Sequence, residues 1–119
     1  MNSNLIGAYG EHLAAKYLRD DKYVIKAANF KSNKGEIDLI AEKNNVLCFV
    51  EVKTRKVGGM LPPAEAVDVR KQENIKSCAA VYINRYASLD VTVRYDIIEV
   101  LIEQENEKQY KINHIKNAF

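Results

Sequence analysis

The sequence predicts an α/β protein in which helices flank one mixed β-sheet, with the elements in the order α-β-β-β-α-β-β. Apolar residues recur at helical spacing over 6–19 and again from about Ala64 to Tyr86. Between these helices, two strand-like runs at 36–42 and 46–55 flank a pair of asparagines. The second helix joins two core strands and therefore makes a crossover, which is right-handed if those strands are parallel.

The first helix, at 6–19, carries an apolar stripe and leads into an extended segment. The members of the stripe are Ile6, Gly10, Leu13, Ala14, Tyr17 and Leu18. This spacing is typical of a helix that packs one face against a sheet. The extended segment begins at Tyr23-Val24-Ile25.

Asn44 and Asn45 predict the turn of a β-hairpin, because asparagine tolerates the left-handed conformation that a two-residue turn demands. With this turn, Lys43 faces Val46 and the register of the hairpin follows. One face then pairs only apolar residues, namely Ala41–Cys48, Leu39–Val50 and Ile37–Val52. The other face pairs Ile40–Phe49, Asp38–Glu51 and Glu36–Lys53. Two carboxylates are therefore expected to oppose each other, with an amine two residues further along the same face.

The later elements follow from the same kinds of pattern. A loop at 57–63 contains both prolines, and the helix after it carries a stripe formed by Ile75, Cys78, Ala79, Tyr82, Ile83 and Tyr86. A strand at 91–102 is predicted to be buried on both faces near its centre. A polar turn at 103–108 then leads to a weaker strand at 110–115.

Length and composition favour one domain over 1–119, which could bury roughly 65% of its unfolded surface. Hydrophobic residues make up 47% and charged residues 29%, which is ordinary for a globular protein and excludes a mostly disordered chain. No apolar run approaches the roughly 20 residues that span a bilayer. The first residues lack the basic region of a signal peptide, so we expect a cytoplasmic protein.

The two cysteines, Cys48 and Cys78, lie 30 residues apart within apolar patterns. They have neither the paired spacing of a zinc site nor the density of a secreted disulfide scaffold. We expect buried free thiols in a reducing cytosol.

The net charge of +2 is too small to indicate nucleic-acid binding by itself. Its distribution is more informative, because residues 22–76 hold 11 Lys and Arg against 7 Asp and Glu. Several of these bases follow or precede core elements: Arg55 and Lys56 end the second hairpin strand, and Arg70 and Lys71 lie early in the second helix. Such side chains suit contacts with phosphate groups.

The pairing of Asp38 with Glu51 points to a cation, because like charges that face each other across strands destabilise a sheet. Lys53 could supply it, but Mg²⁺ or Mn²⁺ would suit the two carboxylates better, since Mg²⁺ prefers hard oxygen ligands. A metal there would favour hydrolysis of a phosphodiester, with Lys53 orienting the attacking water or stabilising developing charge. The alternative is a solvated ion pair between Glu36 and Lys53, which such spacing commonly produces.

Several short motifs lie along nearly the whole chain. They are Gly7, Gly10-Glu11 and Ala14, then Asn29-Phe30, 35–40, 49–55, 63–68, Arg70-Lys71-Gln72 and Tyr95-Asp96. Together these motifs are specific, whereas an isolated Asp followed by Glu-x-Lys is a weak signal. Through them the sequence resembles the YraN-like family of small bacterial predicted endonucleases, which are similar to archaeal Holliday junction resolvases.

The resemblance implies a restriction-endonuclease-like fold and a catalytic site of the PD-(D/E)xK type. In that pattern Asp38 and Glu51 bind the metal and Lys53 is the catalytic lysine. A first-helix acid of resolvases corresponds to Glu11, which would complete the metal site. Gln72 is a further candidate, for contact with a metal-bound water or a phosphate. For Glu11 and Gln72 the alternative is an ordinary exposed polar side chain. Asp96 is interpreted as structural, paired with a nearby base.

The leading functional hypothesis is an Mg²⁺- or Mn²⁺-dependent endonuclease that acts on DNA, including branched or structured DNA. So small a domain has few residues for reading bases, which favours recognition of shape and backbone. A homodimer would supply the two sites that cutting both strands requires. Two alternatives stay open: a nucleic-acid-binding or partner-docking module without catalysis, and a structural protein in which the charged residues pair only with each other.

Overall fold

The computed structural model of the chain describes residues 3–57, 67–88 and 90–119, and it confirms the predicted order α-β-β-β-α-β-β. The two helices and five strands are α1 (Ser3–Asp20), β1 (Val24–Ser32), β2 (Gly35–Lys43), β3 (Val46–Val57), α2 (Val69–Tyr86), β4 (Thr92–Glu103) and β5 (Tyr110–Ile115). The last strand has the bounds expected from the sequence, and α1 is longer than expected at its N-terminal end.

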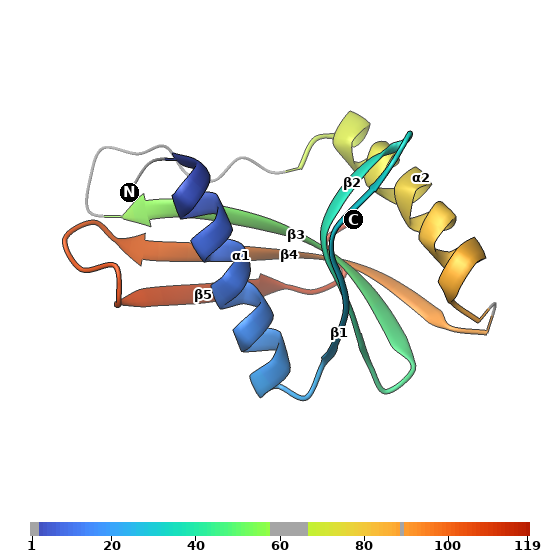
Figure 1. The fold of residues 1–119 in the computed structure, drawn as a ribbon, viewed down its shortest axis with the longest axis horizontal. Helices are drawn as coiled ribbons and strands as arrows, with labels where there is room; N and C mark the ends of the chain where they lie inside the picture. Colours follow the sequence, from blue (N-terminus) through green and yellow to red (C-terminus); the bar gives the residue numbers. More distant parts are fainter. Residues whose placement is uncertain (1–2, 58–66, 89) are drawn as a thin grey trace.

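The five strands form one mixed sheet in the order β1-β2-β3-β4-β5. β3 and β4 are parallel and are joined through α2, which is the crossover that the sequence predicted. The other neighbouring strands are antiparallel. Figure 1 shows the twist of this sheet, with α1 lying across β3, β4 and β5 and α2 beside β1 and β2. No helix in the described residues is long and apolar enough to cross a membrane.

The start of α2 differs from the prediction, which placed it near Ala64. The helix begins at Val69, because Asp68 has extended backbone angles and its side chain accepts a hydrogen bond from the Lys71 N–H at 2.8 Å. Asp68 is therefore the N-cap of α2, and the helix starts at the residue after it. Residues 64–66, and most of the predicted loop at 57–63, lie outside the described residues.

The turn between β2 and β3 is the one the sequence predicted. Asn44 and Asn45 both have positive φ, 52° and 62°, as a two-residue hairpin turn requires. The register is confirmed from Lys43–Val46 at the turn up to Leu39–Val50. Beyond that pair β2 stays with β1, while β3 continues against β4 alone.

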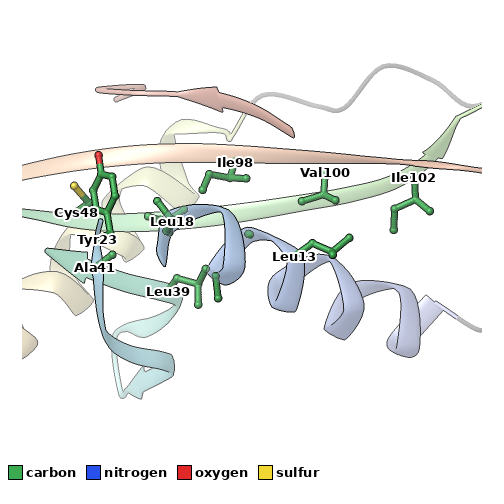
Figure 2. Close-up of a cluster of buried hydrophobic side chains, with 12 residues drawn as sticks. Leu13, Leu18, Tyr23, Leu39, Ala41, Cys48, Ile98, Val100 and Ile102 are labelled. Atoms are coloured by element: carbon green, nitrogen blue, oxygen red, sulfur yellow. The ribbon is translucent and has the colours of Figure 1, made fainter. Parts of the chain in front are cut away.

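Two apolar clusters cover the two faces of the sheet. The first lies under α1 and includes, with others, Leu13, Leu18, Leu39, Val50, Ile98, Val100 and Ile102, most of which Figure 2 labels. The second lies under α2 and contains Ile37, Ile40, Leu47, Phe49, Val67, Ile75, Cys78, Ala79 and Tyr82. Alternate residues of β3, such as Phe49 and Val50, enter opposite clusters, as the period of two requires. Both cysteines are buried and free, as expected.

α1 packs closely on β3 at Gly10. A Cβ atom on Gly10 would collide with the side chain of Thr54. Glycine is therefore required where the helix backbone meets the strand, and this approach brings the first turns of α1 beside the second half of β3.

Candidate active site

Asp38 lies where the ladder between β2 and β3 ends. The predicted pairs Ile37–Val52, Asp38–Glu51 and Glu36–Lys53 are absent from the ladder, which stops at Leu39–Val50. In their place the Val52 N–H donates a hydrogen bond of 2.8 Å to Oδ2 of Asp38. The carboxylate thus satisfies a backbone group of β3 where the strands begin to separate.

The alternation of side chains between the two faces of the sheet also breaks at Asp38. Ile37 packs under α2, although the prediction placed it on the same face as Leu39, which packs under α1. On the neighbouring strand, Asn29 lies between the pairs Ala28–Leu39 and Phe30–Ile37 and has a positive φ of 52°. Asparagine tolerates this conformation, and we attribute the break in alternation to this irregularity opposite Asp38.

Asp38 is partly buried among other acids, and its pKa is raised to about 7. Burial is the largest cause, and repulsion from Glu51 is the second. Glu11 adds to the rise, while the Val52 N–H and Lys71 oppose it. Asp38 therefore lies in an environment that disfavours its negative charge and would attract a cation.

Glu51 is 5% exposed, and its carboxylate lies beside two lysine amines. The sequence predicted Asp38 opposite it and only one of these lysines, Lys53, near it. Oε1 of Glu51 lies 2.6 Å from Nζ of Lys71 and 3.6 Å from Nζ of Lys53. Lys71 lies in the first turn of α2, and its backbone N–H is the group that donates to the N-cap Asp68. The strand and the helix thus bring two amines to one buried carboxylate.

Burial lowers the pKa of the Lys71 amine, but its hydrogen bond and attraction to Glu51 outweigh burial and leave the pKa raised. Lys71 is therefore a stable cation beside Glu51. The sequence grouped it with phosphate-binding residues, and its place in the acid site was missed. An i, i+2 or i, i+3 pattern could not have revealed it, because the contact joins β3 to α2.

Glu11 projects from α1 near the same acids, close enough to raise the pKa of Asp38. Within the described residues, however, no three His, Cys, Asp or Glu side chains gather closely enough to form a cage for a metal ion. Of the two other acids that raise the pKa of Asp38, Glu51 has the larger effect, and the part of Glu11 in a metal site stays a prediction.

The donor set of Asp38 and Glu51 fits Mg²⁺ or Mn²⁺. Magnesium ions bind through one or two carboxylates and keep several waters, so a three-carboxylate cage is not required. Burial first, and then the charge of Glu51, raise the pKa of Asp38, and a divalent cation bound there would favour its charged form. Lys53 and Lys71 supply part of that positive charge in the chain as it stands.

The other predicted phosphate-binding residues lie in two places. Arg55 and Lys56 lie in the second half of β3. Arg55 Nε lies 3.8 Å from Glu99 Oε2, and Lys56 Nζ lies 3.0 Å from Glu107 Oε1. Arg70 is exposed and lines a depression of about 340 Å³ with Lys71, Glu36 and Gly35. Arg70 thus lies on the same side as the acid site, whereas Arg55 and Lys56 lie further along the strand.

The side chain of Gln72 is engaged within its own helix start. Its Nε2 donates a hydrogen bond of 2.8 Å to the carbonyl of Val67. The bond ties the residue before the N-cap to the first turn of α2, which also carries Lys71. Gln72 therefore supports the helix that delivers Lys71 to Glu51, and its contact with a water or a phosphate stays a prediction.

Asp96 belongs to a separate buried network, which confirms its structural interpretation. Its carboxylate accepts two hydrogen bonds of 2.8 Å from Arg94, and one of 3.0 Å from the Asn117 N–H. Nε2 of His114 lies 2.7 Å from Asp96 Oδ2, and the hydroxyl of Tyr17 lies 3.0 Å from Nδ1 of the same ring. The sequence suggested a base near Asp96 but gave no sign of His114 or Tyr17, which come from distant strands and helices.

The architecture and the site together define a class of protein: an α/β protein with a five-stranded mixed sheet flanked by two helices, and with carboxylates and lysines at the open end of its central hairpin. The chain belongs to the family described as "Uncharacterised protein family UPF0102", which matches residues 10–100. This is the YraN-like family that the motifs indicated.

Close relatives cover nearly the whole chain. A UPF0102 protein of Alkaliphilus oremlandii is 47% identical over 116 residues, which cover 96% of this chain and 97% of the relative. One from Caldanaerobacter subterraneus subsp. tengcongensis is 45% identical over 119 residues, covering 100% and 98%. A third, from Acetivibrio thermocellus, is 40% identical over 121 residues, covering 99% and 93%. Their names assign no activity.

Proposed function

We propose that the protein is a metal-dependent endonuclease that hydrolyses phosphodiester bonds of DNA. The observation that carries this proposal is the placement of two lysine amines on Glu51 beside Asp38, where β2 and β3 separate. A partly buried aspartate with a raised pKa, beside a buried glutamate and adjacent cations, is typical of sites that perform chemistry on an anionic substrate.

In the proposed reaction, the oxygen of a water molecule attacks phosphorus and one ester P–O bond breaks, giving a phosphate monoester and a free hydroxyl. Asp38 and Glu51 would hold Mg²⁺ or Mn²⁺, which polarises the phosphoryl oxygen and lowers the pKa of a bound water. Lys53 would donate hydrogen bonds from its amine to the attacking water or to the phosphate, where charge develops. Lys71, from α2, adds a second positive charge on the same face.

The partners and location follow as parts of the same proposal. DNA is the substrate, and branched or structured DNA suits a chain with few side chains free to read bases. A homodimer with two-fold symmetry would place two such sites on two strands. The cytoplasm is the compartment in which such a nuclease would meet DNA.

A second candidate is a binding module that keeps this fold without catalysis. Lys71 favours it, because an amine 2.6 Å from Glu51 already balances the buried carboxylate in the absence of a metal. In that case the charged residues would stabilise the fold and the basic side chains would bind DNA without cutting it.

Cleavage of duplex, single-stranded and four-way-junction DNA with Mg²⁺ and with Mn²⁺ tests the proposal. We expect the wild type to cut at least one substrate, and Lys53→Met to lose roughly 100-fold or more in rate, the scale of one lost electrostatic contact in an active site. Lys26→Met is the matched control, because Lys26 lies on β1 and its pair with Glu42 is 3.7 Å long.

The outcomes separate the two candidates. Equal rates for the wild type and Lys53→Met on every substrate with both metals would contradict the endonuclease proposal. Binding of DNA by a wild type that cuts none of the substrates would favour the non-catalytic module.

A further inference from the structure

We infer that the groove between α1 and β3 holds the nucleotide next to the scissile phosphate, and that Gly7 keeps the groove open for it. This inference rests on the proposed action on DNA. The groove has a volume of about 450 Å³ and is lined by Ile6, Gly7, Glu11, Val52, Arg55 and Lys56. Sites for small ligands occupy roughly 300–1,000 Å³, so its size suits one nucleotide unit.

Gly7 has no packing reason to be glycine. A Cβ atom built on it meets no atom of the described residues within 4 Å, apart from those of its own helix turn, whereas one on Gly10 would collide with Thr54. Its φ is not in the left-handed region, so the backbone does not require glycine either. Glycine within a helix is destabilising relative to alanine, and nothing in the fold offsets this at Gly7. Its effect is to leave the wall of the groove open.

Two residues of the groove also act on Asp38 of the acid site. Glu11 lines the groove and also acts on Asp38, whose pKa it raises. Val52 lines it as well, and the N–H of the same residue donates to Oδ2 of Asp38 at 2.8 Å. A strand of DNA with its scissile phosphate at Asp38 and Glu51 would therefore have its neighbouring nucleotide beside this groove.

The lining matches the chemistry of a nucleotide. Ile6 and Val52 offer apolar surface for the face of a base, which stacks on apolar and aromatic groups with little regard to sequence. Arg55 and Lys56 bring positive charge for a phosphate, and their side chains are 27% and 24% exposed. Glu99 lies 3.8 Å from Arg55 Nε and Glu107 lies 3.0 Å from Lys56 Nζ, so a bound phosphate would share these two cations with the carboxylates.

The experiment compares Gly7→Leu with Ala8→Leu. Leucine is a good helix former at both positions, but only at Gly7 does it enter the groove, because Ala8 is exposed and does not line it. The probe is a short fluorescein-labelled single-stranded oligodeoxynucleotide, titrated by fluorescence anisotropy in EDTA. We expect Gly7→Leu to bind roughly tenfold more weakly than wild type, a loss of about 1.4 kcal/mol, with an unchanged or higher Tm. Ala8→Leu should bind as the wild type does.

Each outcome decides the inference. Equal affinity of the wild type and Gly7→Leu, equal losses in both leucine variants, or a wild type that does not bind the probe would overturn it. If Gly7→Leu weakens binding while the wild type cuts no DNA with Mg²⁺ or Mn²⁺, the groove stands and the endonuclease proposal falls. If Gly7→Leu binds and cuts normally while Lys53→Met does not cut, the reverse holds.

Discussion

Asp38 illustrates how a site for chemistry conflicts with stability at the scale of one residue. Its carboxyl has an ordinary pKa of roughly 3.9 in an unfolded chain, and a pKa raised to about 7 in the fold. The folded state therefore binds this proton more tightly. The resulting stabilisation is fully present below about pH 4 and is lost as the pH rises through about 7.

We predict that Asp38→Asn makes the chain more stable than the wild type at pH 8 in EDTA, by roughly 1–3 kcal/mol. The amide has no charge to desolvate, and its oxygen can still accept the hydrogen bond from Val52. Urea unfolding at pH 5 and pH 8 measures the effect, and the gap should widen toward pH 8. If the free energies of unfolding of the two proteins changed equally between pH 5 and pH 8, the charge of Asp38 would not destabilise the fold.

Lys71 leads to a prediction about metal affinity, because its amine and a divalent cation would compete for Glu51. Lys71→Met should bind Mn²⁺ more tightly than the wild type, by roughly tenfold for a change of about 1.4 kcal/mol. Isothermal calorimetry measures this directly. Arg85→Met is the control, since this substitution removes one positive charge from the last turn of the same helix. Weaker or unchanged Mn²⁺ binding in Lys71→Met would refute the competition.

The residues of the candidate site were predicted from the sequence more completely than their contacts. Alternation along the hairpin placed Asp38, Glu51 and Lys53 near one another, because local register depends only on the turn. Lys71 could not be placed, because its contact with Glu51 depends on how α2 docks on the sheet. Its side chain is thus an example of tertiary structure that no short sequence pattern encodes.

At the scale of elements, the contact between α1 and β3 depends on two glycines that behave differently. A methyl group on Gly10 would collide with Thr54, whereas one on Gly7 would meet open space. We predict that Gly10→Ala lowers the free energy of unfolding by roughly 1–3 kcal/mol through overpacking. Gly7→Ala should raise it by roughly 0.5–1 kcal/mol through helix propensity.

Chemical denaturation of the two alanine variants beside the wild type gives both values in one series. The opposite signs are the informative result, since both substitutions add the same methyl group to the same helix. Destabilisation of similar size in both variants would mean that α1 does not approach β3 as closely as the structure has it.

Element boundaries show where local patterns were sufficient and where they failed. The turn at Asn44-Asn45 was predictable because positive φ at two successive residues favours asparagine. The start of α2 was misplaced because apolar spacing alone cannot distinguish the residues before a cap from the helix itself, and Asp68 is the residue that decides it. The change of face at Ile37 was missed because a strict period of two allows no irregularity opposite Asp38.

At the scale of the whole molecule, the network around Asp96 joins elements from both ends of the chain. Tyr17 of α1, Asp96 of β4 and His114 of β5 form one connected set. Burial opposes the charge on Asp96, but hydrogen bonds from His114, Arg94 and the Asn117 N–H outweigh it and lower the pKa to about 2. A lowered pKa means that this stabilisation is present above about pH 4 and is lost as the pH falls toward 2.

We predict that Asp96→Asn lowers the free energy of unfolding at pH 7 by roughly 3 kcal/mol, the scale for breaking a buried ion pair. The difference from the wild type should shrink as the pH falls from about 4 to about 2, where the wild-type carboxylate gains its proton. Urea unfolding across this range measures it, with the exposed Asp90→Asn as the control. A difference that stays constant with pH would contradict the role given to Asp96.

The order of the elements and the mixed sheet were predictable because helical and strand periodicities are local and strong in this chain. The crossover through α2 was predicted from the helix that joins the two strands, and the parallel pairing of β3 with β4, which the sequence left open, comes from the structure. The network of Asp96, His114 and Tyr17 was beyond prediction, because its members meet only after the sheet and α1 have come together.

The pairing of β3 with β4 also bears on the order in which the molecule acquires its structure. Every residue of β3 pairs with one 46 positions later, from Val46–Thr92 to Val57–Glu103. Contacts of such separation close late in folding, whereas the hairpin of β2 and β3 closes across two residues. We therefore expect the hairpin from Lys43–Val46 to Leu39–Val50 to form early, and Lys71 to reach Glu51 only when α2 docks. Until then the carboxylate of Glu51 lacks a cation that balances it in the native chain.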